Sequence, residues 1–205
     1  MAEALGVVKS GRLRATNLRF LADSYGDDLP KARELYSEAK SIAEQTEYFS
    51  ASATVRYAES LTEYNAGNVE TAIALISQSL SNFTQVRTVH LLRGAGNFTL
   101  ARYLLAVGCF DEARLHANES LAVGRKLDEM ALVALSLAAI AVVKGHSGEY
   151  LNAALLWMFC DVRLRALDPI EERDGAKGWR FVSYYSLGGN PVPTVLALRS
   201  TRQFR

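Results

Sequence analysis

The chain has 205 residues and a mass of 22.5 kDa, and its 23 basic and 22 acidic residues give a formal charge of +1. This length suits one compact domain or one short array of repeats, and a hydrophobic content of 49% excludes an intrinsically disordered chain. The near-neutral charge argues against a protein that coats nucleic acid. Two cysteines exclude a disulfide scaffold and fit a reducing cytoplasm.

The N-terminal residues carry Glu3 and no basic segment, which predicts no secretory signal. The longest apolar run covers residues 130–143. It is shorter than the roughly 20 residues that a membrane-spanning helix needs, so we expect a buried core helix there. We therefore expect a cytoplasmic protein without a membrane partner.

Proline is confined to positions 30, 169, 191 and 193, so residues 31–168 contain none. Because proline costs about 3 kcal/mol inside a helix, this long segment permits continuous helices. Its apolar residues recur at helical spacing, as in Ala72, Ile76 and Leu80. The first 170 residues are predicted to be all-α.

A repeat of about 40 residues runs through this helical part. Glycines expected in turns stand at positions 26, 67, 108 and 148, and each precedes an alanine that opens a second apolar stripe: Ala32, Ala72, Ala113 and Ala153. We expect each glycine to take the left-handed conformation that ends one helix. Each alanine lets two antiparallel helices approach closely. Because one hairpin cannot bury its own apolar face, four hairpins must stack.

The segments Gly-Cys-Phe-Asp-Glu-Ala (108–113) and Gly-Glu-Tyr-Leu-Asn-Ala (148–153) resemble the centre of a tetratricopeptide repeat (TPR). The family's paired large and small positions before the glycine are filled by Leu100-Ala101 and Ile140-Ala141. The resemblance implies an all-α fold in which about four TPR-like repeats stack as antiparallel hairpins in a right-handed α-solenoid. The period near 40 is similar to the C-terminal repeats of large bacterial transcription regulators that carry a nucleotide-binding switch domain, which implies a role in transcriptional signalling.

Two repeats depart from the family pattern. Repeat one has an extra residue between Gly26 and Ala32, which predicts that Pro30 lies in the first turn of its second helix. Repeat two has Glu59-Ser60 where Leu-Gly or Leu-Ala is usual.

The composition divides the chain into a repeat domain over residues 1–174 and an irregular basic tail over residues 175–205. The tail has five basic residues and no acidic residue, and Gly188-Gly189-Asn190-Pro191 breaks any helix. Such a tail is either a mobile terminus or a contact for nucleic acid or an acidic partner. No nucleic-acid partner is expected for the repeat domain.

The sequence contains no phosphate-binding loop and no H-E-x-x-H, so we expect no catalytic residues, no cofactor and no metal. Gly94-Ala95-Gly96 is interpreted as a helix start or a close helix contact. Cys109 is expected in an exposed turn and Cys160 in the core. An enzyme would require a site assembled in space between repeats.

The TPR resemblance implies that a partner binds along the concave face, which the first helix of each hairpin lines. The expected groove residues are Tyr57, Leu61, Tyr64, Asn65, Phe98, Arg102, Leu105 and His146, with Ala138 and Val142 in the same register. The aromatic rings would grip an extended segment or a helix, and Asn65 and Arg102 would bind its backbone or a carboxylate. The alternative is that several of these aromatic residues belong to the core between repeats.

We therefore predict a non-enzymatic module that binds a protein or peptide. The alternative is a sensor that holds a small effector against the helix at 130–143. Because repeat arrays need polar caps at their ends, the terminal repeat is predicted to be covered by the tail or by a second copy in a homodimer.

Overall fold

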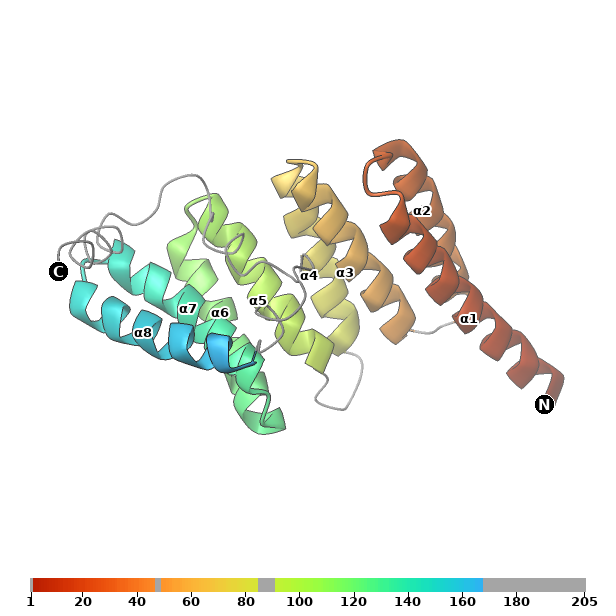
Figure 1. Ribbon diagram of the computed structural model, residues 1–205. Coiled ribbons are helices and arrows are strands. Elements are labelled where there is room, and N and C mark those ends of the chain that lie inside the picture. The colour runs from red at the N-terminus through yellow and green to blue at the C-terminus, as the bar shows by residue number, and fades with distance from the viewer. Residues whose placement is uncertain (1, 47–48, 85–90, 168–205) are drawn as a thin grey trace. The chain divides into compact units, whose positions relative to one another are not determined.

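The computed structural model describes residues 2–46, 49–84 and 91–167, and these form eight α-helices (Figure 1). In chain order they are α1 (Ala2–Ser24), α2 (Leu29–Gln45), α3 (Phe49–Asn65), α4 (Val69–Thr84), α5 (Leu91–Ala106), α6 (Phe110–Leu127), α7 (Met130–His146) and α8 (Tyr150–Leu167). The predicted all-α fold is confirmed over these residues, whereas the predicted tail at 175–205 lies outside them. Within the described ranges, no helix is both long and apolar enough to cross a membrane.

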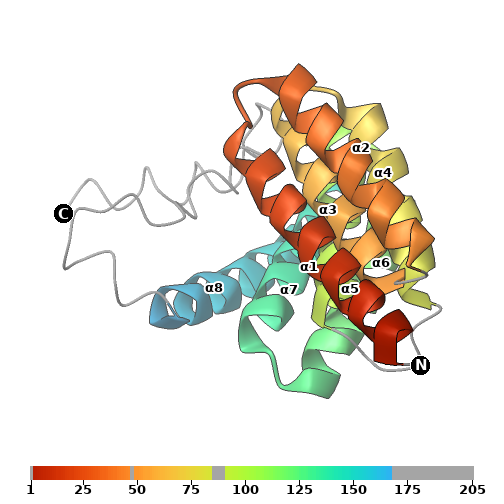
Figure 2. The ribbon, with the colours of Figure 1, turned by 90° about the vertical axis from the view of Figure 1, so that its right-hand side faces the viewer.

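The chain divides into two compact units inside α5, Met1–Gly96 and Asn97–Arg205. In the first unit α1 packs on α2 and α3 packs on α4, and α3 also contacts α1 and α2 (Figure 2). In the second unit α7 packs on both α6 and α8. The two helices α5 and α6 meet at the Gly108 turn, and His116 on α6 shares a 2.9 Å hydrogen bond with Asn97 on α5.

The repeat register predicted from the sequence is present in the structure. All four register alanines are buried, and the small residues seven positions later, Ala39, Ser79, Ser120 and Cys160, are fully buried. In two hairpins this position makes the same contact. The Ser79 hydroxyl donates to the Ala53 carbonyl at 2.7 Å, and the Cys160 thiol donates to the Ala134 carbonyl at 3.1 Å, each 26 residues upstream.

The turn glycines differ between the first hairpin and the others. Gly67, Gly108 and Gly148 have φ of 85°, 79° and 83°, which confirms the predicted left-handed turn at these positions. The prediction is wrong for Gly26, which does not have a positive φ. The extra residue lengthens this turn, so the chain reverses without a left-handed residue. Asp28 then caps α2 by accepting from the Lys31 amide at 3.2 Å, and Pro30 lies in the first turn of α2 as predicted.

This difference predicts unequal effects of alanine in the two turns of the first unit. Gly67→Ala is expected to reduce the free energy of unfolding by about 1 kcal/mol, because a Cβ disfavours positive φ. No atom lies within 4 Å of the added Cβ, so the cost comes from backbone conformation alone. Urea denaturation checks the value, with Gly26→Ala as the matched control that should leave stability unchanged. Equal losses in both variants would contradict this explanation.

Candidate functional site

One face of α3 carries four of the expected groove residues. Tyr57, Leu61 and Tyr64 follow one another at helical spacings of four and three residues, which places them on one side of the helix. Asn65 joins this side because it follows Leu61 by four residues. The first three are half-buried and Asn65 is exposed. The structure thus brings together apolar rings, a leucine and an amide on one helix face, here called the α3 face.

Behind this face, a buried carboxylate connects α3 to α2. Glu63 is only 1% exposed and accepts two hydrogen bonds from the Arg33 guanidinium, at 2.6 Å and 2.8 Å. The Asn68 side-chain amide donates a third at 2.8 Å. Hydrogen bonding from Arg33 holds the pKa of Glu63 below its ordinary value, against the opposing effect of burial. Glu63 is therefore ionised at neutral pH and ties the C-terminal half of α3 to α2.

Repeat two departs from the family pattern at Glu59-Ser60, and the structure shows how this departure is accommodated. Ser60 is fully buried, so it fills the small position that glycine or alanine usually takes. Glu59 is 7% exposed, and the Lys40 ammonium on α2 lies 2.7 Å from its carboxylate. A charged pair thus replaces the usual leucine contact between the helices without a change of register.

Tyr36 adds a third polar connection in the first unit. Its hydroxyl donates to the Asp23 carboxylate at 2.7 Å and lies 2.9 Å from the Thr62 hydroxyl, so it contacts both α1 and α3. Burial raises the pKa of Tyr36, so the hydroxyl stays protonated and able to donate. These polar contacts fix the rotation of α3 about its axis and hence the direction of the α3 face.

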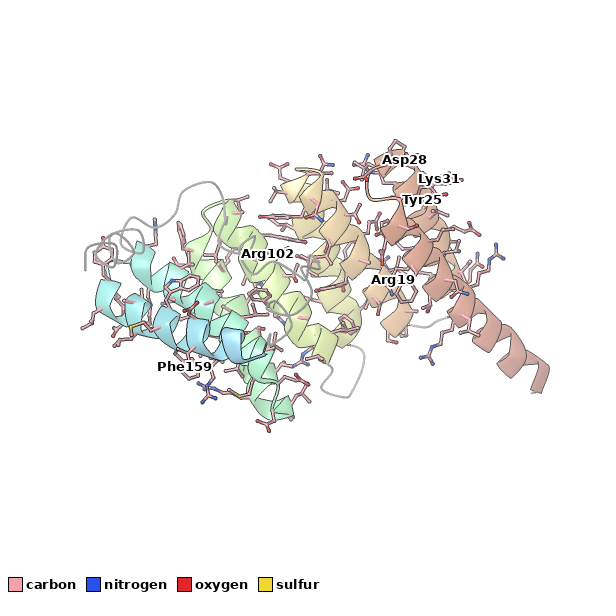
Figure 3. All side chains as sticks on the ribbon, in the orientation of Figure 1. Arg19, Tyr25, Asp28, Lys31, Arg102 and Phe159 are labelled. Atoms are coloured by element: carbon pink, nitrogen blue, oxygen red, sulfur yellow. The ribbon has the colours of Figure 1, made fainter. Side chains whose placement is uncertain are left out.

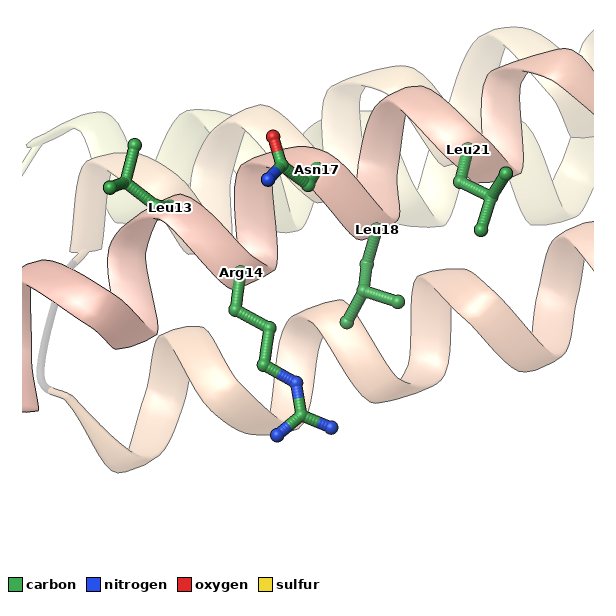
Figure 4. A pocket seen from close by; sticks show the side chains of 5 residues that line it. All are labelled: Leu13, Arg14, Asn17, Leu18 and Leu21. Carbon is green, nitrogen blue, oxygen red and sulfur yellow. The ribbon is translucent and has the colours of Figure 1, made fainter.

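An open hollow of about 440 Å³ lies along α1, where the sequence suggested no groove residue (Figure 4). It is lined by Leu13, Arg14, Asn17, Leu18 and Leu21. Leu13 and Leu21 are 64% and 46% exposed, and Arg14 forms a 2.6 Å ion pair with Glu38 on α2. The sequence signal for this hollow is the series Leu13, Leu18 and Leu21 on α1, of which Leu18 packs against the buried cluster of α1 to α3.

In the second unit, the expected groove residues have different exposures. Phe98 and Leu105 are 9% and 8% exposed, so most of their area packs inside the molecule. Arg102 is half-buried on the same face of α5, and its guanidinium carbon lies 5.2 Å from the centre of the Tyr103 ring (Figure 3). Phe98, Arg102 and Leu105 lie on one face of α5, because they are separated by four and three residues. Ala138 and Val142, in the same register on α7, are half-buried.

His146 lies at the end of a different helix, α7, and is exposed. Its ring stacks on Phe110 with 3.5 Å between ring centres and 14° between planes. The imidazole therefore helps to join the start of α6 to the end of α7. Phe110 therefore covers one face of the imidazole.

The surroundings of the two cysteines and of His116 affect their chemistry. Cys109 is exposed and Cys160 is buried, as predicted. Burial raises the pKa of Cys160 to about 11, so the thiol is protonated and a poor nucleophile at neutral pH. Burial also lowers the pKa of His116. Among the side chains that the structure describes, no group of three histidines, cysteines or carboxylates is placed to hold a metal ion.

Comparison with known proteins identifies the fold. No family model and no curated protein matches the chain in sequence. The solved structures similar to it include two of a Podosopora anserina protein assigned as a kinesin light chain with nearly identical TPR-like repeats. One, a single-substitution variant, has 20% identity and a TM-score of 0.64 and covers 94% of each chain. The other has 17% identity and a TM-score of 0.63, covering 94% of this chain and 92% of that one. The chain therefore has the fold of TPR-like helical repeats.

Proposed function

We propose that the chain is a non-enzymatic module that binds a protein or peptide segment along the first helices of its hairpins. TPR-like repeats typically mediate protein–protein interactions, and the fold supports the same role here. The main support is the α3 face, where two tyrosine rings and a leucine lie partly open beside Asn65. The ion pair between Arg33 and Glu63 holds this face in place, so little order has to be gained on binding.

The residues on these faces indicate the chemistry of the partner. Tyr57 and Tyr64 provide large, rigid apolar surfaces with a hydroxyl at the edge, which suits the apolar side chains of an extended segment or a helix. Asn65 can donate and accept hydrogen bonds with a peptide backbone. In the second unit, the guanidinium of Arg102 suits a carboxylate, either a side chain or a chain terminus.

We expect substitutions on the α3 face and at Arg102 to weaken peptide binding. The probe is a peptide selected against the full chain from a random display library and titrated by calorimetry. Tyr64→Ala and Arg102→Ala should each raise the dissociation constant at least about tenfold, because aromatic and arginine residues dominate such interfaces. Tyr25→Ala removes a tyrosine that is 40% exposed outside the α3 face and serves as the matched control. Unchanged affinity in both test variants would remove these residues from the binding surface.

The repeat length supports a narrower proposal, that the module serves transcriptional signalling in a bacterial cytoplasm. The period of about 40 residues is similar to the repeats of the large bacterial regulators, whose repeats adjoin a nucleotide-binding switch domain. The test is the coding region around this sequence. A nucleotide-binding domain encoded in the same reading frame would support the proposal, and a neighbourhood without regulatory genes would count against it.

A further inference from the structure

The last helix, α8, carries a row of exposed apolar side chains. Leu151, Leu155, Met158 and Val162, here called the outer stripe, are 75%, 56%, 66% and 67% exposed. Their spacing of four, three and four residues places them on one side of the helix. The other side of α8 packs on α7, where Cys160 is fully buried against Ala134. Phe159, at the edge of the stripe, is 39% exposed (Figure 3).

This row is not a general property of the repeat. The equivalent positions, counted from the register alanine, are Pro30, Glu34, Ser37 and Ser41 in the first hairpin, Glu70, Ala74, Ser77 and Ser81 in the second, and Asp111, Leu115, Asn118 and Ala122 in the third. All of them are exposed, and only Leu115 is a large apolar residue. The repeat thus normally leaves this face in water. The fourth hairpin alone makes it apolar, which indicates that something covers it.

The geometry of the outer stripe favours another helix as its occupant. Apolar residues spaced by four and three positions form the seam of a two-helix contact, with side chains of one helix fitting between those of the other. The four residues carry no charge. The charged residues nearest to them, Asp161 and Arg163, lie toward the C-terminal end of the stripe.

A second α8 satisfies these requirements when it runs antiparallel. Leu151 then lies opposite Val162 of the partner subunit, and Leu155 lies opposite Met158 of the partner subunit, so the stripe is complementary to itself about a two-fold axis. The antiparallel direction also separates Asp161 and Arg163 from their own copies, which a parallel pair would bring together. Complete burial of the four residues in both copies would remove at most roughly 1,000 Å² from water, the lower size of a specific interface.

We propose that two copies of the chain form a symmetric dimer through the outer stripes of α8. The pairing uses residues of α8 and none of the residues of the α3 face. The dimer would remove from water the apolar side chains that distinguish the fourth hairpin.

Light scattering after size exclusion of the full chain tests the dimer over a range of concentrations. The wild type should show twice the mass of 22.5 kDa, and Leu155→Glu should show the single mass, because the charge would be buried in the seam. Leu115→Glu is the matched control, since Leu115 occupies the same repeat position and is 63% exposed, and it should remain dimeric. A wild type that is monomeric throughout, as it would be if its own residues 168–205 covered the stripe, overturns the proposal. A Leu155→Glu protein that stays dimeric overturns it as well.

Circular dichroism separates loss of pairing from loss of folding. If Leu155→Glu loses helical signal, Leu155→Ser removes the apolar contact without adding a charge. It should raise the dimer dissociation constant at least about tenfold in sedimentation equilibrium. An unchanged constant would refute the seam. Peptide titration of the same variants reports on the α3 face independently, so failure of the dimer and failure of the proposed function are distinguishable.

Discussion

Replacement of Tyr36 by alanine is expected to lower the free energy of unfolding by about 3 to 5 kcal/mol, which is a large part of the stability of an ordinary domain. The ring is fully buried in a cluster that includes Ala32, Leu35 and Val55. Truncation would leave a cavity among residues from three helices, α1 to α3. It would also remove the hydroxyl that Asp23 and Thr62 share as a hydrogen-bond partner.

Urea denaturation followed by circular dichroism measures this loss. Tyr36→Phe keeps the ring and loses only the hydroxyl, so its expected cost is about 1 kcal/mol. Tyr25→Ala, at a position 40% exposed, should change stability by no more than about 0.5 kcal/mol. If Tyr36→Ala cost no more than Tyr36→Phe, the ring would not be the packing centre of the first unit.

Glu63→Gln is expected to cost about 1 to 3 kcal/mol at neutral pH, because the amide keeps only one acceptor oxygen and its NH2 group would face an Arg33 N–H donor in a buried position. The amide has nearly the same shape as the carboxyl group, so packing is preserved. The substitution leaves Asn68 with an oxygen acceptor but removes the negative charge that Arg33 contacts. The loss therefore reports on the charge of Glu63 rather than on its volume.

The pH dependence of this loss has a definite sign. The pKa of Glu63 is lower in the folded chain than its ordinary value of 4.5, so the unfolded chain takes up the proton first as the pH falls. The stability that Glu63 contributes is complete above pH 4.5 and is lost as the pH falls through the lowered pKa. The difference in free energy of unfolding between the wild type and Glu63→Gln should consequently become smaller below pH 4.5. Unfolding curves at a series of pH values between neutral and strongly acidic test this trend.

Glu34→Gln supplies the control for that experiment. Glu34 pairs with Lys31 at 2.7 Å on the surface, where water screens the charges, so its substitution should leave both the stability and its pH dependence unchanged. If the difference in free energy of unfolding between the wild type and Glu63→Gln stayed constant down to acidic pH, Arg33 would not be holding the Glu63 carboxylate ionised.

The sequence predicted the helical fold and the register because both depend on residues that any hairpin of this kind needs. A small residue such as Ala72 or Ala113 permits close helix contact, and a glycine such as Gly108 permits the turn. The conformation of Gly26 was not predictable from spacing alone. With one additional residue, the turn can reverse the chain either with or without a left-handed glycine. The backbone of the structure shows that Gly26 does not have a positive φ.

The candidate site was predictable only in part. Helical spacing placed Tyr57, Leu61 and Tyr64 on one face, but it could not state how much of Phe98 and Leu105 neighbouring side chains would cover. Large apolar residues occur on every side of α8, which hides the difference between its two faces. What distinguishes the outer stripe from the opposite face of α8 is that α7 packs on that opposite face.

The bonds that Ser79 and Cys160 make to carbonyls in the preceding helix bear on how such arrays change length during evolution. An insertion between a register alanine and the residue seven positions later would slide one helix along its neighbour and break the bond. An insertion in the connecting turn leaves the register intact, as in the first hairpin, where Ala32 and Ala39 are fully buried despite the additional residue. Insertions and deletions among homologous arrays should therefore accumulate in the turns. The spacing between each register alanine and the residue seven positions later should stay constant.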